Sequence, residues 1–140
     1  MNSESAKSTK PQSIKIGICG FGTVGRGSYD LLHTNGEEIT LRVGCLIDVV
    51  RIASRSIKSG DVHSAVKISN DPFDVVNDPE VDIVIETLGG FDPAFEVVRQ
   101  ALANGKHVVT ANKALVAERG NELFTVAEEN AVTLSFESSV

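Results

Sequence analysis

The stretch IKIGICGFGTVG, at residues 14–25, places a β-branched run directly before three closely spaced glycines. The run at 14–19 predicts a strand, and the residues that follow predict a helix over 23–34. The glycines between them form the pattern GxGxxG and are Gly20, Gly22 and Gly25. After a strand and before a helix, this pattern is typical of a dinucleotide-binding loop, because the absent side chains let the main chain approach a diphosphate. The alternative is an ordinary strand–turn–helix corner.

Strand and helix patterns alternate along almost the whole chain. Further strands are predicted at residues 41–47, 66–69, 82–86, 107–110 and 132–136. Helices are predicted at 71–76, 92–104, 114–118 and 122–129, and a short helix is predicted within 49–62. Parallel neighbours need crossover connections, so this order predicts a doubly wound parallel sheet with helices on both faces, a Rossmann-like α/β fold.

The composition fits one globular domain. The chain has 140 residues, of which 41% are hydrophobic and 23% charged, which argues against disorder, collagen and coiled coil. We expect a disordered tail at residues 1–12 and the domain at residues 13–140. The net charge of −6 argues against nucleic acid or an anionic membrane as a partner, since both are negatively charged and bind clusters of Lys and Arg.

Cysteine usage and the absence of targeting segments in the sequence suggest where the protein works. Cys19 and Cys45 lie in apolar runs, which favours buried thiols in a reducing compartment over a disulfide or a reactive thiol. No stretch of the sequence has the apolar length of a membrane span or the apolar middle of a signal peptide. The expected location is the cytoplasm.

Asp48 is a candidate for binding the ribose of a dinucleotide. It stands at the predicted end of the second strand, 23 residues after Gly25, close to the roughly 20-residue offset at which an acidic side chain binds the ribose of NAD. Its carboxylate would accept from the 2′-hydroxyl and repel a 2′-phosphate, whereas Arg51 would attract that phosphate. The alternative is that Asp48 caps a helix or forms a turn, since both are common roles of Asp. The spacing favours NAD and leaves NADP open.

Two further segments follow predicted strand ends. Thr87, Leu88 and Gly89 follow the strand at 82–86, at the edge where doubly wound sheets bind ligands, although a flexible turn is an equally good interpretation. Lys113 follows the strand at 107–110, and beside a nicotinamide it would bind the cofactor or transfer a proton. A surface lysine is otherwise simply a solvated charge.

The three histidines give no sign of a metal or catalytic site. They have neither metal-ligand spacing nor an adjacent carboxylate, which favours structural roles for His33, His63 and His107.

The chain resembles the amino-terminal part of homoserine dehydrogenase over residues 14–140. The matching segments are IGICGFGTVG, VDIVIETLGG, NGKHVVTANKALVAERGNEL and FESSV. The resemblance implies an NAD- or NADP-dependent enzyme that interconverts homoserine and aspartate semialdehyde in threonine and methionine biosynthesis, working as a homo-oligomer in the cytoplasm. It also implies that this chain is the cofactor-binding part.

The resemblance also implies roles for individual residues. The residues matching Phe21, Thr23 and Val24 contact the dinucleotide, and the lysine matching Lys113 lies at the nicotinamide and assists proton transfer. A monovalent cation, Na⁺, is bound in the family by a segment whose first two positions match Glu137 and Val140.

The chain departs from the family pattern at its end. It stops at Val140, before an AGGIP-like segment and the substrate-binding and dimerisation region, so we expect it to bind cofactor without turning over homoserine. One alternative is another Rossmann reductase, similar to inositol dehydrogenase or dihydrodipicolinate reductase, which would carry a different segment in place of TANKALVA. Another is a non-catalytic dinucleotide sensor, which would carry a DNA-binding module.

Overall fold

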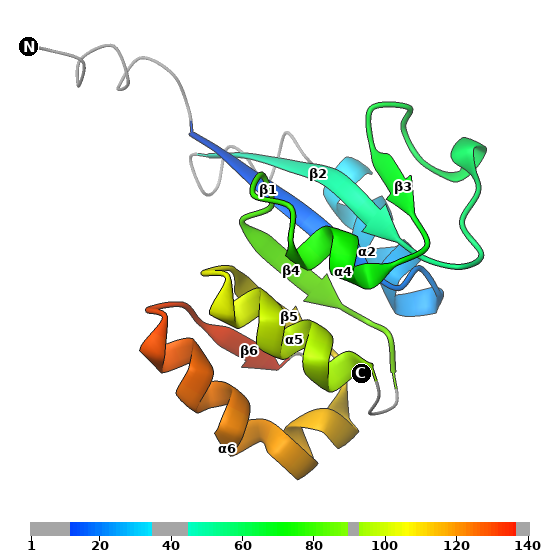
Figure 1. The fold of residues 1–140 in the computed structure, drawn as a ribbon. Coiled ribbons are helices and arrows are strands. Elements are labelled where there is room, and N and C mark those ends of the chain that lie inside the picture. The colour runs from blue at the N-terminus through cyan, green and yellow to red at the C-terminus, as the bar shows by residue number, and fades with distance from the viewer. Residues whose placement is uncertain (1–11, 35–44, 90–92, 137–140) are drawn as a thin grey trace, which may run out of the picture.

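A computed structural model describes residues 12–34, 45–89 and 93–136 (Figure 1). The strands are β1 (Gln12–Cys19), β2 (Cys45–Ala53), β3 (Lys67–Ser69), β4 (Ile83–Glu86), β5 (His107–Thr110) and β6 (Leu134–Phe136). The helices are α2 (Thr23–Thr34), α4 (Pro72–Val76), α5 (Ala94–Ala103) and α6 (Lys113–Glu129), with a 3-10 turn at Ser59–Asp61.

The described strands form one parallel sheet in the order β3-β2-β1-β4-β5-β6. The chain runs outward from β1 to β3 and then returns to β4 on the other side of β1 (Figure 1). The strand order therefore reverses between β1 and β4, and this is the place where doubly wound sheets bind ligands beyond the carboxyl ends of their strands.

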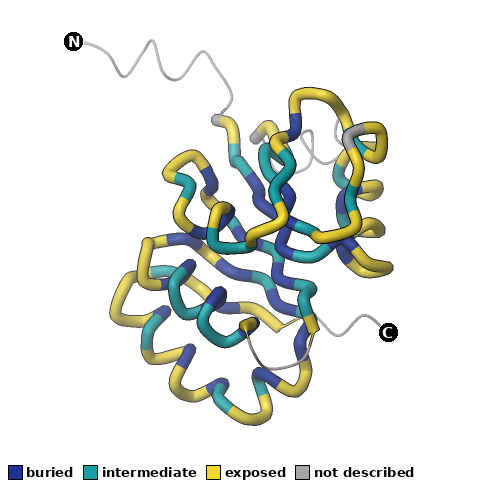
Figure 2. Tube along the Cα trace, turned by 45° about the vertical axis from the view of Figure 1, so that its right-hand side comes forward, coloured by how far each residue is buried: buried dark blue, intermediate teal, exposed yellow. Residues whose placement is uncertain are grey.

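Helices cover both faces of the sheet and create two apolar cores. On one face, Tyr29 of α2 packs with Ile16, Ile18 and Ile52 of the strands. On the other face, residues of α4, α5 and α6 pack with alternate strand residues such as Val84. In Figure 2 the buried positions lie along the central strands, while exposed positions mark the outer sides of the helices. The predicted fold class, a doubly wound α/β sheet, is confirmed.

Most predicted elements are present within a few residues, and two of them match to the residue. These are the helix at 23–34 and the strand at 107–110. The two predicted helices at 114–118 and 122–129 form one helix, α6, with a kink at Arg119, where φ is −131° and ψ is 20°. The guanidinium of Arg119 lies over the ring of Phe95 in α5, 3.9 Å from its centroid.

The predicted end of the second strand is wrong, and the short helix predicted within 49–62 is present only as a single 3-10 turn. Strand β2 continues through Asp48 to Ala53, and the segment that follows contains only the 3-10 turn at Ser59–Asp61. Val49, Val50 and Ile52 pack into the two cores. Pairing with a central strand and burial of apolar side chains therefore outweigh the poor β propensity of a single Asp.

Cys19 has the buried thiol that the sequence predicted. Cys19 is fully buried and makes no disulfide, and burial, together with the nearby Glu86 carboxylate, raises the pKa of its thiol. Of the tail predicted at residues 1–12, residues 1–11 lie outside the described residues, and Gln12 is the first residue of β1. Among the helices of the described ranges, none has both the length and the apolar character to cross a membrane.

Candidate functional site

Three loops meet at the carboxyl edge of the sheet, where β1, β4 and β5 end. Cys19 of β1 is the register partner of Glu86 in β4, and Glu86 is the partner of Thr110 in β5. The loops that leave these three residues therefore begin at the same level. They contain the glycine loop (residues 20–25), the segment 87–89 and the segment 111–113, which we call the edge loops.

The glycine loop has the close packing that its pattern predicts. Gly20 has φ of +97°, and a β-carbon there would lie 2.7 Å from the hydroxyl oxygen of Thr87. A β-carbon on Gly25 would lie 2.2 Å from the carbonyl oxygen of Gly20, whereas one on Gly22 would meet nothing within 4 Å. The outer glycines thus make the turn possible, and Gly22 faces open space.

Helix α2 begins directly at this loop. The amide of Arg26 donates to the carbonyl of Gly22 at 2.8 Å, which starts the helical ladder. The first turn of α2, which is fully described, carries no acidic side chain. Thr23 and Val24 are exposed there, so the helix N-terminus presents its main-chain amides and partial positive charge at the sheet edge.

Thr87 ties the second edge loop to the glycine loop. Its amide donates to the carbonyl of Cys19 at 2.9 Å. Its hydroxyl lies 3.1 Å from the carbonyl oxygens of both Cys19 and Gly20. Leu88 is half-buried and Gly89 is exposed with φ of +76°. Hydrogen bonds therefore hold the start of the segment Thr87–Gly89 against the glycine loop.

Lys113 is the first residue of α6 and lies on the third edge loop. The side chain of Asn112 caps this helix by accepting from the amide of Leu115 at 3.1 Å. The Lys113 side chain itself is exposed. The structure thus brings Lys113 to the same edge as the glycine loop and the segment 87–89.

Phe21 differs from its neighbours in the glycine loop because its side chain faces the core. Only 3% of Phe21 is exposed, and its ring meets Tyr29 edge to face at 6.0 Å. The guanidinium of Arg26 lies over the same ring, 4.6 Å from the centroid. Phe21 can meet a ligand only through its main chain, and its side chain stabilises the start of α2.

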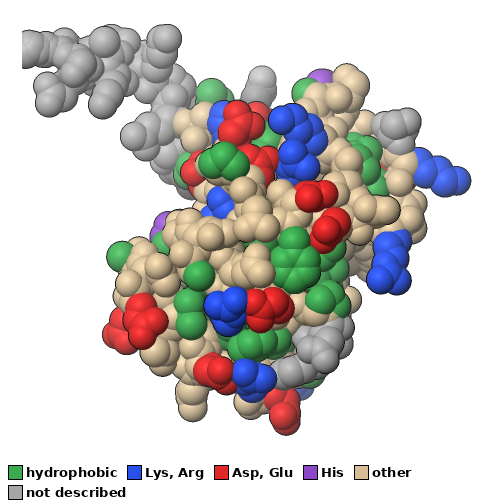
Figure 3. Space-filling model, viewed as in Figure 1, with side chains coloured by type: hydrophobic (Ala, Val, Ile, Leu, Met, Phe, Trp, Pro, Cys, Tyr) green, Lys and Arg blue, Asp and Glu red, His purple; other side chains and the backbone are tan. Residues whose placement is uncertain are grey.

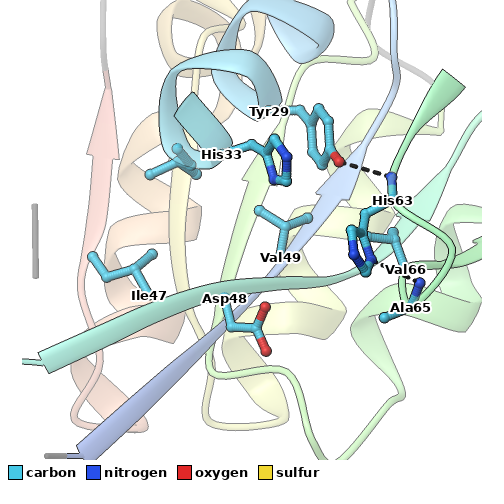
Figure 4. A pocket seen from close by; sticks show the side chains of 9 residues that line it. Tyr29, His33, Ile47, Asp48, Val49, His63, Ala65 and Val66 are labelled. Atoms are coloured by element: carbon cyan, nitrogen blue, oxygen red, sulfur yellow. Dashed lines mark hydrogen bonds between the residues drawn. The ribbon is translucent and has the colours of Figure 1, made fainter. Parts of the chain in front are cut away.

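Asp48 is not at this edge, which corrects the position that the spacing predicted. It lies in the middle of β2, five residues before the strand ends at Ala53. Figure 4 draws its carboxylate across the β2 ribbon from Tyr29 and His33, and Asp48 is one of the residues that line the cavity on this part of β2, away from the edge loops. Its register partner on β1 is Lys15, and this neighbour of opposite charge favours an acid within the strand.

Arg51, the candidate for a 2′-phosphate, is also occupied elsewhere. Its Nε donates to the carboxylate of Asp78 at 2.8 Å. Although burial raises the pKa of Asp78, hydrogen bonds from the amide of Glu80 and from Arg51 hold that pKa below its usual value. Arg51 therefore serves an ion pair beside the sheet and not the ligand edge.

The true end of β2 carries residues that the strand prediction missed. Ser54, Arg55 and Ser56 follow Ala53 directly, and Arg55 and Ser56 are exposed. The hydroxyl of Ser54 accepts from the amide of Ser56 at 3.2 Å, which makes a tight turn. The amide of Gly20 donates to the carbonyl of Ala53 at 2.8 Å, so this turn lies beside the glycine loop. Val49, Val50 and Ile52 were the available signal that the strand continues.

A separate cavity of about 270 Å³ lies on the α2 side of β2 (Figure 4). His33 stacks on Tyr29 with ring centroids 5.4 Å apart. The amide of His63 donates to the Tyr29 hydroxyl oxygen at 2.9 Å, and Nδ1 of His63 accepts from the amide of Ala65. His107 accepts from the amide of Thr133 through Nδ1. These contacts agree with structural roles for the histidines.

The predicted cation-binding residues are not part of the described site. Glu137 and Val140 lie outside the described residues. Within residues 12–34, 45–89 and 93–136, no group of three or more His, Cys, Asp or Glu is arranged to hold a metal ion. On the face drawn in Figure 3, acidic and basic side chains are interspersed.

Comparison with known proteins agrees with this geometry. Residues 20–137 match the family model described as the NAD binding domain of homoserine dehydrogenase. A homoserine dehydrogenase of Pseudomonas aeruginosa is 49% identical over 127 residues, which cover 91% of this chain and 29% of that protein. One of Bacillus subtilis is 35% identical and covers 92% of this chain and 30% of the relative.

Solved structures give the same result. The crystal structure of a homoserine dehydrogenase from Thiobacillus denitrificans has a TM-score of 0.84 and 51% identity, with 92% of this chain and 30% of that chain covered. The chain thus spans about 30% of the length of the curated relatives named here. The chain belongs to the homoserine dehydrogenase family and corresponds to its NAD-binding domain.

Proposed function

We propose that the edge loops bind NAD(P), with the diphosphate against Gly20–Gly25 and the nicotinamide between residues 87–89 and Lys113. The observation that carries this proposal is the packing of Gly25 and Thr87 against Gly20, which leaves Gly22 and the first turn of α2 open at the switch point. A diphosphate fits there because main-chain amides and the helix dipole both favour an anion. Thr23 and Val24 flank it on the first turn, and Phe21 contributes its main chain.

We further propose that NADP is the preferred cofactor, reversing the expectation that rested on Asp48. An acid that binds the ribose belongs at the end of the second strand, and that position holds Ser54, Arg55 and Ser56. The exposed guanidinium of Arg55 and the two hydroxyls suit a 2′-phosphate. Asp48 and Arg51 take no part in the proposed site.

The reaction that we propose for the whole protein is the reversible reduction of aspartate semialdehyde to homoserine, within threonine and methionine biosynthesis. The reduced cofactor supplies a hydride to the carbonyl carbon. The carbonyl oxygen takes up a proton, and we assign the holding or relay of that proton to the ammonium of Lys113, which begins α6 at the same sheet edge. This chain orients the cofactor, and we do not expect it to oxidise homoserine on its own.

Several properties of the whole protein stay predictions. These are the cytoplasmic location, assembly into a homo-oligomer, and a monovalent cation, Na⁺, held in part by Glu137 and Val140.

The test is a side-by-side titration of the chain with NADPH and NADH, followed by the fluorescence of the reduced nicotinamide. We expect saturable binding of both, with NADPH bound more tightly. Absence of binding to either dinucleotide contradicts the proposed function. Tighter binding of NADH contradicts only the assignment of Ser54–Ser56 to a 2′-phosphate.

A further inference from the structure

Glu86 is a buried carboxylate to which the proposed function gives no role. It is the last residue of β4, and none of its surface is exposed. Burying a carboxylate is costly unless several donors satisfy it. A strand residue that faces the core is normally apolar, as Val84 is two residues earlier. The acid at this position therefore calls for a specific reason.

The two carboxylate oxygens of Glu86 bind two different edge loops. One oxygen accepts from the hydroxyl of Thr110, at the end of β5, at 2.5 Å. The other accepts from the amide of Leu88, in the segment 87–89, at 2.8 Å. The main-chain carbonyl of Glu86 also accepts from the amide of Ala111 at 3.2 Å. One residue thus joins the second edge loop to the third.

The hydrogen bonds continue from Thr110 to the start of α6. The hydroxyl oxygen of Thr110 accepts from the amide of Asn112 at 3.0 Å, and the side chain of Asn112 caps α6. Lys113 is the next residue. The position of the Lys113 main chain relative to Leu88 is therefore fixed through the Glu86 carboxylate.

The glycine loop is held by a different residue. The hydroxyl of Thr87 donates to the carbonyls of Cys19 and Gly20. Among the described residues, the Glu86 side chain accepts from Leu88 and Thr110 and makes no hydrogen bond to residues 20–25. The diphosphate end of the proposed site thus depends on Thr87. The end at residues 88–89 and Lys113 depends on Glu86.

We propose that Glu86 is a positioning residue for the nicotinamide half of the cofactor: its carboxylate holds Leu88 and Lys113 at the separation that a nicotinamide needs. This inference rests on the proposed function and adds a residue to it. A carboxylate offers an acceptor oxygen to each partner, whereas an amide has one oxygen and one NH₂ group. With an amide here, the Thr110 hydroxyl, which already accepts from the amide of Asn112, would have to accept a second time and would lose the acceptor for its own proton. Glutamine at this position has the same size but turns a donor toward one of the two partners.

The test compares a ligand that has a nicotinamide with one that lacks it. NADPH, NADH and ADP-ribose are titrated into the chain by calorimetry, because ADP-ribose keeps the adenosine and the diphosphate without the nicotinamide. For Glu86→Gln we expect the Kd of the reduced dinucleotides to rise about tenfold, the equivalent of about one hydrogen bond to the cofactor lost when the loops shift. The Kd of ADP-ribose should stay within about twofold, since the glycine loop is unchanged.

Thr110 provides a second pair of variants in case Glu86→Gln does not fold. Thr110→Val removes the hydroxyl at constant shape and should give the same selective loss, whereas Thr110→Ser keeps the hydroxyl and should restore dinucleotide binding. The matched control is Glu96→Gln, which changes a partly exposed glutamate of α5 that pairs with Arg99. This control should bind all three ligands normally.

The outcomes separate the two proposals. If the unchanged chain binds none of the three ligands, both the proposed cofactor site and the proposed role of Glu86 are wrong. If the unchanged chain binds them, but Glu86→Gln or Thr110→Val weakens ADP-ribose as much as NADPH, or weakens neither, the role of Glu86 is overturned and the cofactor site stands. A merely structural role predicts equal losses for both kinds of ligand.

Discussion

Gly25 and Gly20 approach so closely that a β-carbon on Gly25 would lie 2.2 Å from the carbonyl oxygen of Gly20. The contact packs the first turn of α2 onto the end of β1. Gly25→Ala must therefore displace main chain, and we expect the free energy of unfolding to fall by about 1–3 kcal/mol. Thermal unfolding followed by circular dichroism measures this. Gly27→Ala is the control, because its β-carbon meets nothing within 4 Å and alanine favours a helix.

Gly22 allows the ligand proposal to be separated from packing. Its β-carbon would also meet nothing within 4 Å, so Gly22→Ala should fold with an unchanged melting temperature. If the diphosphate lies against this loop, the added methyl group occupies its space, and we expect NADPH affinity to fall at least about tenfold. Unchanged affinity in a folded Gly22→Ala protein would place the diphosphate elsewhere.

If the proposed site is right, Arg55 discriminates between the two cofactors. Arg55→Ala should weaken NADPH binding by about tenfold or more and leave NADH binding nearly unchanged, because only NADPH carries the 2′-phosphate. The matched control is Asp48→Asn, at the position that the spacing favoured for the ribose. It should change neither affinity. A gain in NADPH affinity in Asp48→Asn would instead support the ribose role for Asp48.

The parts of the fold that depend on local signals could be predicted from the sequence. Helix α2 begins at the glycine loop and ends before Asn35 and Gly36, so residues adjacent to each end of the helix indicate where it starts and stops. Strand β5 is a short apolar run between Gly105 and the Asn112 cap. The edge loops follow such strand ends, so the sequence predicted that Gly20, Thr87 and Lys113 lie at one edge of the sheet.

The apolar residues after Asp48 hint that β2 continues, but its end is not set by local sequence, because it depends on pairing with a distant strand. The register between β1 and β2 shifts between Ile16 and Gly17, and this irregularity places Arg51 rather than Val50 opposite Gly17. Nothing near Asp48 in the sequence indicates that shift. The ribose assignment of Asp48 rested on that strand boundary and loses its support with it, although the offset from Gly25 was close to the usual one.

Glu86 shows a second limit of local reasoning. The run DIVIE predicted a buried strand and gave no function to its final acid. The role of that carboxylate depends on Thr110, 24 residues further along the chain. A polar pair at the ends of two buried strands is the signal, and it becomes informative only when the strand order makes them neighbours.

The pair of Arg51 and Asp78 predicts a pH dependence of stability. The folded-state pKa of Asp78 lies below its ordinary value of 3.8, although its burial opposes this. A depressed carboxyl pKa stabilises the folded state above the ordinary value, and that stability is lost as the pH falls through the folded pKa. Asp78→Asn should therefore lower the free energy of unfolding at pH 7, by about 1–3 kcal/mol for a partly buried pair.

The measurement is denaturant unfolding of both proteins from pH 7 downward. The difference between them should shrink once the pH falls below 3.8 and vanish below the folded pKa of Asp78. The exposed pair Arg119–Glu122 supplies the control, because Glu122→Gln should have little effect at any pH. A constant difference across the pH range contradicts the explanation.

Lys113 connects the edge of the sheet to the proposed chemistry. Its side chain is exposed at the first position of α6, so Lys113→Ala should leave the free energy of unfolding within about 0.5 kcal/mol. In a full-length homoserine dehydrogenase with the same substitution, we expect kcat to fall by about 10²–10⁴, the usual contribution of a proton-transferring side chain. Lys67→Ala, at the far edge of the sheet on β3, is the control. An unchanged kcat in Lys113→Ala would remove this lysine from the reacting centre, because a group that holds the proton in the transition state cannot be lost without slowing the reaction.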